Sequence, residues 1–518
     1  MRAKEQIRPA FAILLLTVFV PFASIKAQES KSSQRPVGYG AEGVATSNQT
    51  NGAPNEIEEL RKQVQDLRDL VLQQQQTLLK MQQTADSRAP TTVSDDGIAL
   101  QKVPASLDSD FRNGHDSDRA SEAPPAASQP DPKAQKPAPL LAGWNGRHFV
   151  LRSVDGNFET NITGYAQLDF RGYQRGNHPP NTFLIRRARL GLEGKVMRDF
   201  DFKIEGDFSD TASTLLRDFY VRFHRADGLQ LTFGQFRLPY SQEEIRPDAV
   251  QDFVERSLVN NLAPSRSPGL MVSGVLHKGV FEYQMGAFNG RGLLANNNVG
   301  TPETTVRLRF TPWKNSGSLW TKGFTFGGTY SMGRNAINGT SVRGQTESRS
   351  FTFFTPETVS GPIIRTNGEL TWTIGPAAIR GEYDQVDQFR NRLGPGGTNL
   401  PGLVAKGYMG QFTYLMTGED KTDSAAVAPQ HPFFADEKGR RGFGAWELKF
   451  RYSSLQLDDR TPKSNRAQTI YTGVNWYLNN FVRYVLDLGF EHYRNAALTP
   501  KPGDHNFFVV LSRMQVAW

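Results

Sequence analysis

The sequence predicts an all-β protein: a transmembrane antiparallel β-barrel of about 16 strands, preceded by a coiled-coil helix and a disordered linker. From residue 144 onward, apolar and polar residues alternate in long runs, as in tilted strands that cross a bilayer. The last strand ends on Trp518, and tryptophan favours the membrane–water interface. Mean hydropathy is −0.50, and beyond the first two dozen residues no apolar run approaches the roughly 20 residues of a spanning helix.

Residues 1–27 have the features of a secretory signal peptide. The basic start Met1–Lys4 precedes an apolar run over residues 11–20, and small residues follow near Ala23 and Ala27. A single anchor helix is the alternative, but the run is short and Pro21 follows it directly. Residues 28–54 are rich in Ser, Gly, Asn and Gln, which predicts disorder after export.

Residues 55–83 carry a heptad pattern that predicts a coiled coil. The two seam positions hold Ile57, Val64, Val71 and Leu78, and Leu60, Leu67, Gln74 and Met81. β-branched residues at the first position and leucine at the second favour two strands. A lone amphipathic helix is the alternative, although an isolated helix of this length is marginal in water. Residues 84–143 are rich in Pro, Ala and Ser and predict a flexible linker.

Residues 144–518 form the predicted barrel domain. In Phe200–Phe208 the aromatic and aliphatic side chains share one face of the strand and the charged side chains share the other. A soluble β-sandwich would use the same alternation, but its strands are shorter. The length of this region suits about 14–18 strands, enough to enclose a water-filled lumen.

Composition argues against two other classes of protein. The formal charge is +8, yet basic residues are interleaved with acidic ones, whereas a nucleic-acid-binding protein gathers them in a patch. The sequence has eight His and no Cys, and it holds neither a Gly-rich phosphate loop nor a His-x-x-x-His pair. We therefore expect no nucleic-acid partner, no enzymatic activity, no metal site and no cofactor.

Four blocks in the barrel region resemble the phosphate-selective porin O and P family. They are Phe183–Lys195, Phe233–Pro239 together with Phe253–Pro264, Gly444–Ser454, and Val474–Asn479. The resemblance covers roughly residues 145–518 and implies a homotrimeric, sixteen-stranded outer-membrane barrel that conducts anions such as phosphate through a basic lumen. Family members often carry an amino-terminal coiled-coil segment, which residues 57–81 match. The implied trimer conflicts with the two-stranded preference of the heptads.

A phosphate channel needs guanidinium and ammonium groups along a narrow lumen, which pass the anion from site to site. Strand alternation directs a set of basic side chains inward: Arg171, Arg187, Arg189, Lys195, Lys203, Arg222, Arg307, Arg309, Arg380, Lys449, Arg451 and Arg483. Leu184, Leu190 and Leu192 mark the lipid face of the same block, so Arg186 faces outward unless a bulge shifts the register.

Acidic residues follow the same alternation, so about as many acids as bases face the lumen. Anion selectivity then requires that the two signs be segregated, with arginines gathered at the constriction. The segment 242–267 is too long for a turn, and we expect it to fold into the barrel as a constriction loop with Arg246, Arg256 and Arg266 as its bases. A rim loop or a subunit contact is the alternative.

The predicted function is passive uptake of anions, phosphate or polyphosphate, across the bacterial outer membrane, with lipid as the surrounding partner and the coiled coil in the periplasm. The alternative is a general, weakly selective diffusion porin that also tethers the outer membrane to the cell wall through its coiled coil.

Overall fold

The computed structural model describes Gln65 and residues 140–518, except 175–178, 210–214, 435–438, 440 and 458–463. The predicted signal peptide (1–27), disordered segment (28–54), coiled coil (55–83) and linker (84–143) therefore lie outside the described residues, apart from Gln65 and residues 140–143.

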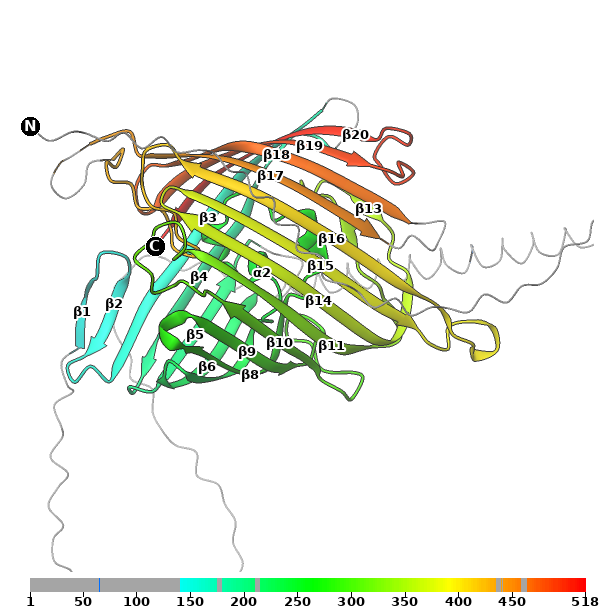
Figure 1. Cartoon of the computed structure of the whole chain (residues 1–518), viewed down its shortest axis with the longest axis horizontal. Coiled ribbons are helices and arrows are strands. Elements are labelled where there is room, and N and C mark those ends of the chain that lie inside the picture. Colours follow the sequence, from blue (N-terminus) through cyan, green and yellow to red (C-terminus); the bar gives the residue numbers. More distant parts are fainter. Residues whose placement is uncertain are drawn as a thin grey trace, which may run out of the picture. The chain divides into compact units, whose positions relative to one another are not determined.

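Sixteen antiparallel strands close into a barrel, as the sequence predicts (Figure 1). They are β3 (Phe158–Tyr173), β4 (Thr182–Val196), β5 (Phe200–Asp207), β6 (Leu216–Ala226), β7 (Leu229–Arg237), β8 (Arg266–Leu276), β9 (Phe281–Phe288), β10 (Glu303–Phe310), β11 (Phe324–Thr340), β14 (Thr358–Ile374), β15 (Ala377–Arg390), β16 (Leu400–Leu415), β17 (Ala445–Leu457), β18 (Asn465–Tyr477), β19 (Val482–Tyr493) and β20 (Asn506–Ala517). Each strand pairs with the next along the chain, and β20 pairs with β3.

The closing seam ends at Trp518. Its backbone N–H donates to the Gly164 carbonyl over 2.9 Å, and the Gly164 N–H donates to the Trp518 carbonyl over 3.0 Å. A Cβ on Gly164 would lie 2.7 Å from the Trp518 ring, so a glycine allows the indole to approach β3 this closely. Next to the seam, β1 (Leu140–Trp144) and β2 (Phe149–Ser153) form a hairpin that pairs with the first residues of β3.

Alternation places charge inside the barrel and apolar side chains outside. On β17, Glu447, Lys449 and Arg451 are buried toward the interior, while Leu448 and Phe450 between them are exposed. A barrel strand in lipid requires this arrangement, because its outer face meets acyl chains and its inner face meets water and other polar groups.

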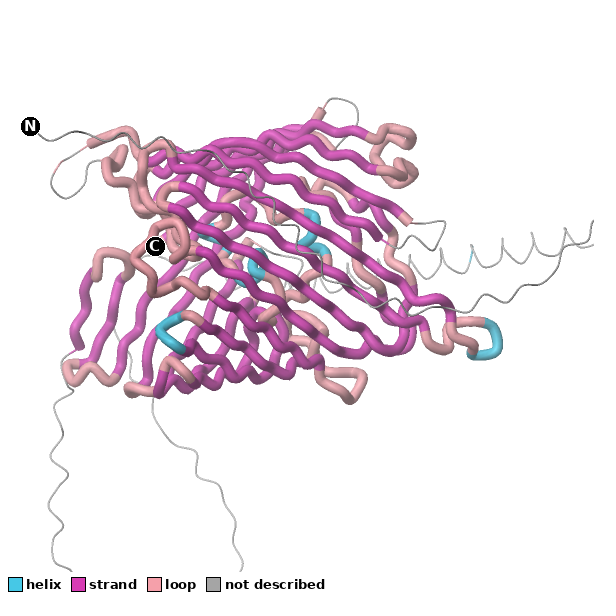
Figure 2. Tube along the Cα trace, in the orientation of Figure 1, coloured by secondary structure: helices cyan, strands magenta, loops and turns pink. Residues whose placement is uncertain are grey.

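The two ends of the barrel differ in their connections. At the end that carries Trp518 most strands are joined by short turns, such as Gly375–Pro376 between β14 and β15. In bacterial outer-membrane barrels the short turns are periplasmic. Longer connections at the other end contain α2 (Gln242–Ile245), the 3-10 helices η1 (Asp248–Val250), η2 (Leu258–Asn261) and η4 (Pro395–Gly397), and the two-stranded sheet of β12 (Gly344–Gln345) and β13 (Thr352–Phe354). The 3-10 helix η3 (His277–Gly279) lies in a turn at the Trp518 end, and strands dominate the described chain (Figure 2).

Candidate functional site

Residues 238–265, which connect β7 to β8 and are called the inner loop below, lie inside the barrel. Ser241 caps α2 by accepting a hydrogen bond from the Glu244 N–H. The Tyr240 hydroxyl donates to the Thr366 carbonyl on β14 over 2.9 Å, and the Val254 N–H donates to Asp487 on β19 over 2.7 Å. The inner loop therefore reaches walls that are far apart around the barrel. This agrees with the predicted infolding of residues 242–267, although Arg266 and Ser267 belong to β8.

Apolar contacts hold the inner loop in place. Leu258 and Leu262 pack in a buried cluster that contains Phe353 of β13 and several residues of the barrel wall. Phe253 and Val254 pack against a second set of wall residues on β18, β19 and β20. Burial of such side chains contributes about 1.5–3 kcal/mol each, so the loop is anchored by packing as well as by charge.

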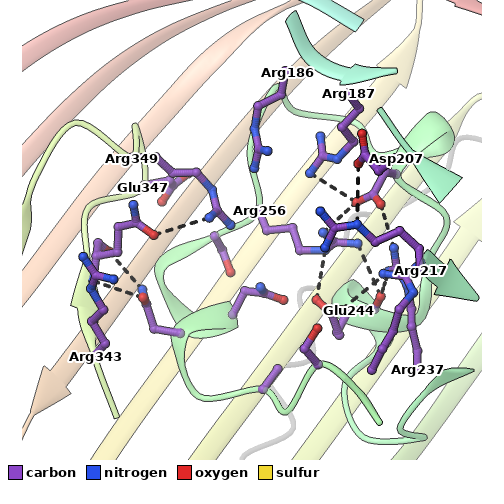
Figure 3. A pocket seen from close by; sticks show the side chains of 18 of the residues that line it. Arg186, Arg187, Asp207, Arg217, Arg237, Glu244, Arg256, Arg343, Glu347 and Arg349 are labelled. Carbon is purple, nitrogen blue, oxygen red and sulfur yellow. Dashed lines mark hydrogen bonds and ion pairs between the residues drawn. The ribbon is translucent and has the colours of Figure 1, made fainter. Parts of the chain in front are cut away.

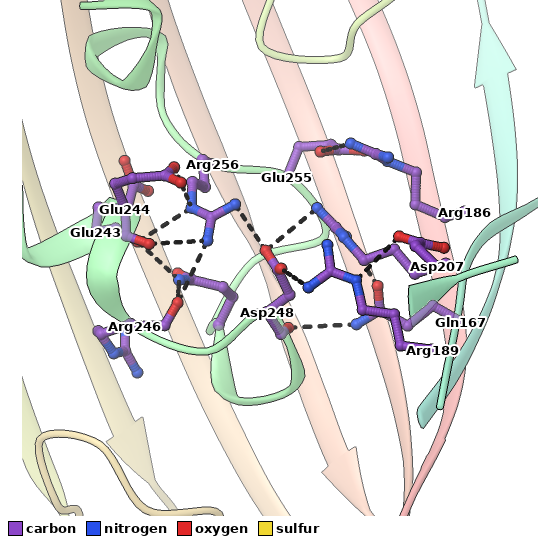
Figure 4. Close-up of polar contacts among 12 residues, drawn as sticks. Gln167, Arg186, Arg189, Asp207, Glu243, Glu244, Arg246, Asp248, Glu255 and Arg256 are labelled. Atoms are coloured by element: carbon purple, nitrogen blue, oxygen red, sulfur yellow. Dashed lines mark hydrogen bonds and ion pairs between the residues drawn. The ribbon is translucent and has the colours of Figure 1, made fainter. Parts of the chain in front are cut away.

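Asp248 of the inner loop is shared by four arginines, of which Figure 4 labels Arg189 and Arg256. Its carboxylate lies 3.3 Å from Arg187, 2.9 Å from Arg189, 2.7 Å from Arg237 and 2.7 Å from Arg256. The first two arginines come from β4 and the third from β7, so one carboxylate joins the inner loop to the wall.

Two further inner-loop carboxylates act in the same way. Asp252 lies 3.0 Å from Arg246, 2.9 Å from Arg380 and 2.8 Å from Lys421. Glu255 has three close arginine partners, Arg171 at 2.5 Å, Arg186 at 2.6 Å and Arg349 at 2.8 Å. Paired buried charges of this kind break at a high cost when one partner is removed, about 3–5 kcal/mol.

The charge environment keeps these carboxylates ionised. Burial alone would raise the pKa of Asp248, but Arg187, Arg256 and Arg237 hold that pKa well below its ordinary value. The pKa values of Asp252 and Glu255 are lowered well below theirs for the same reason, against the same effect of burial. The inner loop therefore remains an anionic segment inside a basic wall.

A basic cavity of about 430 Å³ lies beside the inner loop (Figure 3). Nine arginines line it, against four carboxylates: Arg186, Arg187, Arg189, Arg217, Arg237, Arg256, Arg266, Arg343 and Arg349, with Asp207, Glu244, Asp248 and Glu347. Nine minus four leaves a formal lining charge of +5. The two signs are thus locally segregated, although acids and bases nearly balance over the whole chain.

Two other cavities neighbour the basic cavity. A cavity of about 370 Å³ shares Arg186 and Arg349 with it and adds Arg171. A third, of about 460 Å³, includes Trp518 and so opens toward the end with short turns. Pro247, Ala249 and Val250 line the third cavity while Asp248 lines the basic one, so this short stretch of the inner loop separates the two.

Arg186 occupies a β-bulge. The β3–β4 register pairs Gln167 with Arg187 and then Leu168 with Ile185, so Arg186 is the extra residue. The bulge turns its guanidinium inward to Glu255, where its Nε donates over 2.6 Å. Past the bulge the alternation reverses: Ile185 is exposed, and Leu184, expected on the lipid face, lines the 370 Å³ cavity instead.

The structure divides the predicted basic residues into groups. Arg187, Arg189, Arg256 and Arg266 line the basic cavity, Arg171 lines the second cavity, and Lys203 and Arg483 line the third. Arg246, Arg307, Arg309, Arg380, Lys449 and Arg451 are held in ion pairs with carboxylates elsewhere in the interior. Arg222 donates to the Thr232 hydroxyl over 3.3 Å, and Lys195 is exposed near the end of β4; neither lines a cavity described here.

Sequence reasoning missed two chain segments that also enter the interior. Residues 341–357, between β11 and β14, supply Arg343, Glu347 and Arg349 to the basic cavity. Residues 416–434, which follow β16, enter from the Trp518 end, and their Lys421 lies 2.8 Å from Asp252. The connection from β16 to β17 is long for the Trp518 end, where most connections are short turns, but this length is recognisable only once the strand boundaries are known.

A model of the family described as phosphate-selective porin O and P matches residues 160–518. The chain belongs to this family. Porin O of Pseudomonas aeruginosa is 20% identical to this porin over 404 residues, which are 70% of this chain and 90% of the relative. An uncharacterized protein of Caulobacter vibrioides is 23% identical over 410 residues, 74% of this chain and 78% of that protein.

Solved porin structures give a more distant comparison. The outer membrane channel DcaP of Acinetobacter baumannii superposes with a TM-score of 0.47 at 10% identity, covering 73% of this chain and all of that one. As an outer-membrane channel protein of this family, the chain is a porin rather than an enzyme.

Proposed function

We propose that this porin conducts inorganic anions of the phosphate class by passive diffusion, along a path lined by arginines. The observation that carries the proposal is the basic cavity, with nine arginines and four carboxylates around about 430 Å³. Guanidinium groups suit this task because their planar donors match the oxygens of a phosphate in pairs.

The order of the cavities supports a stepwise path. Arg186 and Arg349 belong both to the 370 Å³ cavity and to the basic cavity, so an anion held by one pair of arginines is already at the edge of the next space. Conduction requires several sites of moderate strength, because a single strong site would retain the anion. The carboxylates Glu255 and Asp248 weaken the binding of the anion at each site, because each carboxylate competes with the anion for the same guanidinium groups.

We also propose that the porin forms a homotrimer in outer-membrane lipid, as the family resemblance implies. Cross-linking of the full-length protein in native membranes, followed by separation without heating, should give a species of three times the monomer mass. A monomer alone would contradict this part of the proposal.

The test of selectivity uses the two shared arginines. In planar bilayers, the double variant Arg186→Gln/Arg349→Gln should lose anion selectivity across a salt gradient and weaken the inhibition of chloride current by phosphate about tenfold. Glu255 keeps Arg171 as a close partner in this variant, which limits structural damage. The matched control Lys195→Gln/Arg222→Gln removes the same charge from residues outside the three cavities.

The competing function is a general diffusion porin that tethers the outer membrane to the cell wall. Its weak selectivity, though not the tether, is favoured by the many interior ion pairs, such as those of Arg307, Arg380 and Arg451. Equal and small shifts of the reversal potential in the test and control variants would support it, and would show that the interior charges act only as paired wall residues.

A further inference from the structure

Three exposed cations stand on the outer face of the barrel wall, near the end away from Trp518. They are Lys406 on β16, Arg466 on β18, and Arg494 directly after β19. Ala405 and Ala467, their neighbours in sequence, are buried toward the interior, so alternation turns Lys406 and Arg466 outward. Most basic side chains of this barrel face the opposite way.

The sheet register places the three cations in one row. Lys406 is paired with Gln456 on β17, and Gln456 is paired in turn with Arg466. The Arg494 N–H donates to the Arg466 carbonyl over 2.8 Å, which extends the row by one strand. Neighbouring strands lie about 4.8 Å apart, so the three Cα atoms fall within about 15 Å of one another. β16 to β19 are consecutive strands of the wall (Figure 1).

The cations of this row differ from the interior cations in their contacts. Among the described residues, none of the three forms an ion pair, and Arg466 donates instead to the neutral amide of Gln456. Interior arginines such as Arg189 contact several carboxylates at once. Within the described part of the chain, the row therefore presents three cations that are not tied up in ion pairs to the surroundings of the barrel.

Apolar side chains on the same strands fix where the row stands relative to lipid. Toward the Trp518 end, the outer face carries exposed Tyr408, Ile470 and Leu488. A basic residue on the lipid face is strongly destabilising at the bilayer midplane but costs little near the membrane interface. Three unpaired cations beyond an apolar band are therefore expected at headgroup depth, with tyrosine at the boundary.

We infer that Lys406, Arg466 and Arg494 form a docking site for the phosphate groups of an anionic lipid in the leaflet at that end of the barrel. Guanidinium and ammonium groups recognise phosphate by charge-assisted hydrogen bonds. The site lies on the outside of the wall, so it takes lipid from the membrane and is separate from the interior cavities. Each cation near an anionic surface contributes about fivefold in affinity.

The experiment measures lipid binding to the full-length porin in detergent. Mixed micelles containing diphosphoryl lipid A are titrated against wild type and against the triple variant Lys406→Gln/Arg466→Gln/Arg494→Gln. We expect the triple variant to bind about a hundredfold more weakly, and the wild-type affinity to fall as salt is added. The charge-preserving variant Lys406→Arg/Arg466→Lys/Arg494→Lys should bind within about twofold of wild type. Heat-modifiable migration reports that each variant is a folded barrel.

The matched control removes three exposed cations from the opposite end of the barrel, as Arg198→Gln/Arg225→Gln/Lys322→Gln. It should bind lipid A as wild type does. Unchanged affinity in the first triple variant would overturn the inference, as would an equal loss in the control. Displacement of the lipid by millimolar inorganic phosphate at constant ionic strength would also overturn it, because the site would then be one for the free ion.

Discussion

Replacing Asp248 with asparagine tests whether the inner loop sets the selectivity of the basic cavity. Four arginines share this carboxylate at 2.7–3.3 Å, and the change raises the formal lining charge of the cavity from +5 to +6. A unit charge about 4 Å from a permeating ion is worth ~1 kcal/mol in water and ~4 kcal/mol at an effective dielectric constant of 20. Taking the lower value, loss of the carboxylate should favour the anion about fivefold and disfavour the cation about fivefold, so the anion-to-cation permeability ratio should rise about 25-fold.

The assay is the reversal potential of the full-length porin in planar bilayers across a tenfold salt gradient, at low and at high ionic strength. Screening should reduce the shift at high salt. Asp248→Glu keeps the charge and should behave as wild type. Asp423→Asn removes a carboxylate that lies 2.9 Å from Arg309 and outside the three cavities, so it controls for interior charge in general. An unchanged reversal potential in Asp248→Asn, or the same shift in Asp423→Asn, would refute the assignment of selectivity to this cavity.

Three further outcomes follow from the same contacts. Arg187→Gln/Arg189→Gln should reduce anion selectivity more than Arg483→Gln, which acts from the third cavity, and reversal potentials compare them. Gly164→Val should lower the yield of heat-modifiable barrel because its Cβ would meet the Trp518 ring, whereas Gly368→Val should not, since no heavy atom lies within 4 Å of the added Cβ. The pKa of Asp248 is held well below its ordinary value, so its charge and the stability it contributes persist until the pH falls through that depressed pKa; the pH dependence of the single-channel current between pH 7 and about pH 4 should therefore be the same in wild type and in Asp248→Asn.

The sequence was sufficient to predict the barrel because alternation is a local signal. Leu448 and Phe450 outside and Lys449 and Arg451 inside follow from period two alone. Alternation failed at Arg186, where a bulge reverses the two faces of β4. A bulge depends on how a strand pairs with its neighbour, so the residue pattern of one strand alone cannot locate it. The inward orientation of Arg186 could therefore be given only as an alternative.

The pairing of interior charges was beyond sequence reasoning for a different reason. Asp248 and Arg189 lie on separate segments, and only the path of the inner loop through the lumen brings them together. The segments 341–357 and 416–444 were missed because their lengths become unusual only after the strand boundaries are known. Arg349 and Lys421 therefore could not be connected with Glu255 and Asp252 in advance.

Near-equal totals of acids and bases do not prevent a local anion site, because position decides the field that an ion meets. Inner-loop carboxylates at positions 248, 252 and 255 each contact three or four bases at once, so a few acids immobilise many arginines without neutralising them all. The surplus charge of the basic cavity is what remains after that pairing. On the path that we propose, a phosphate would meet arginines already oriented by protein carboxylates, which reduces the reorganisation that binding requires.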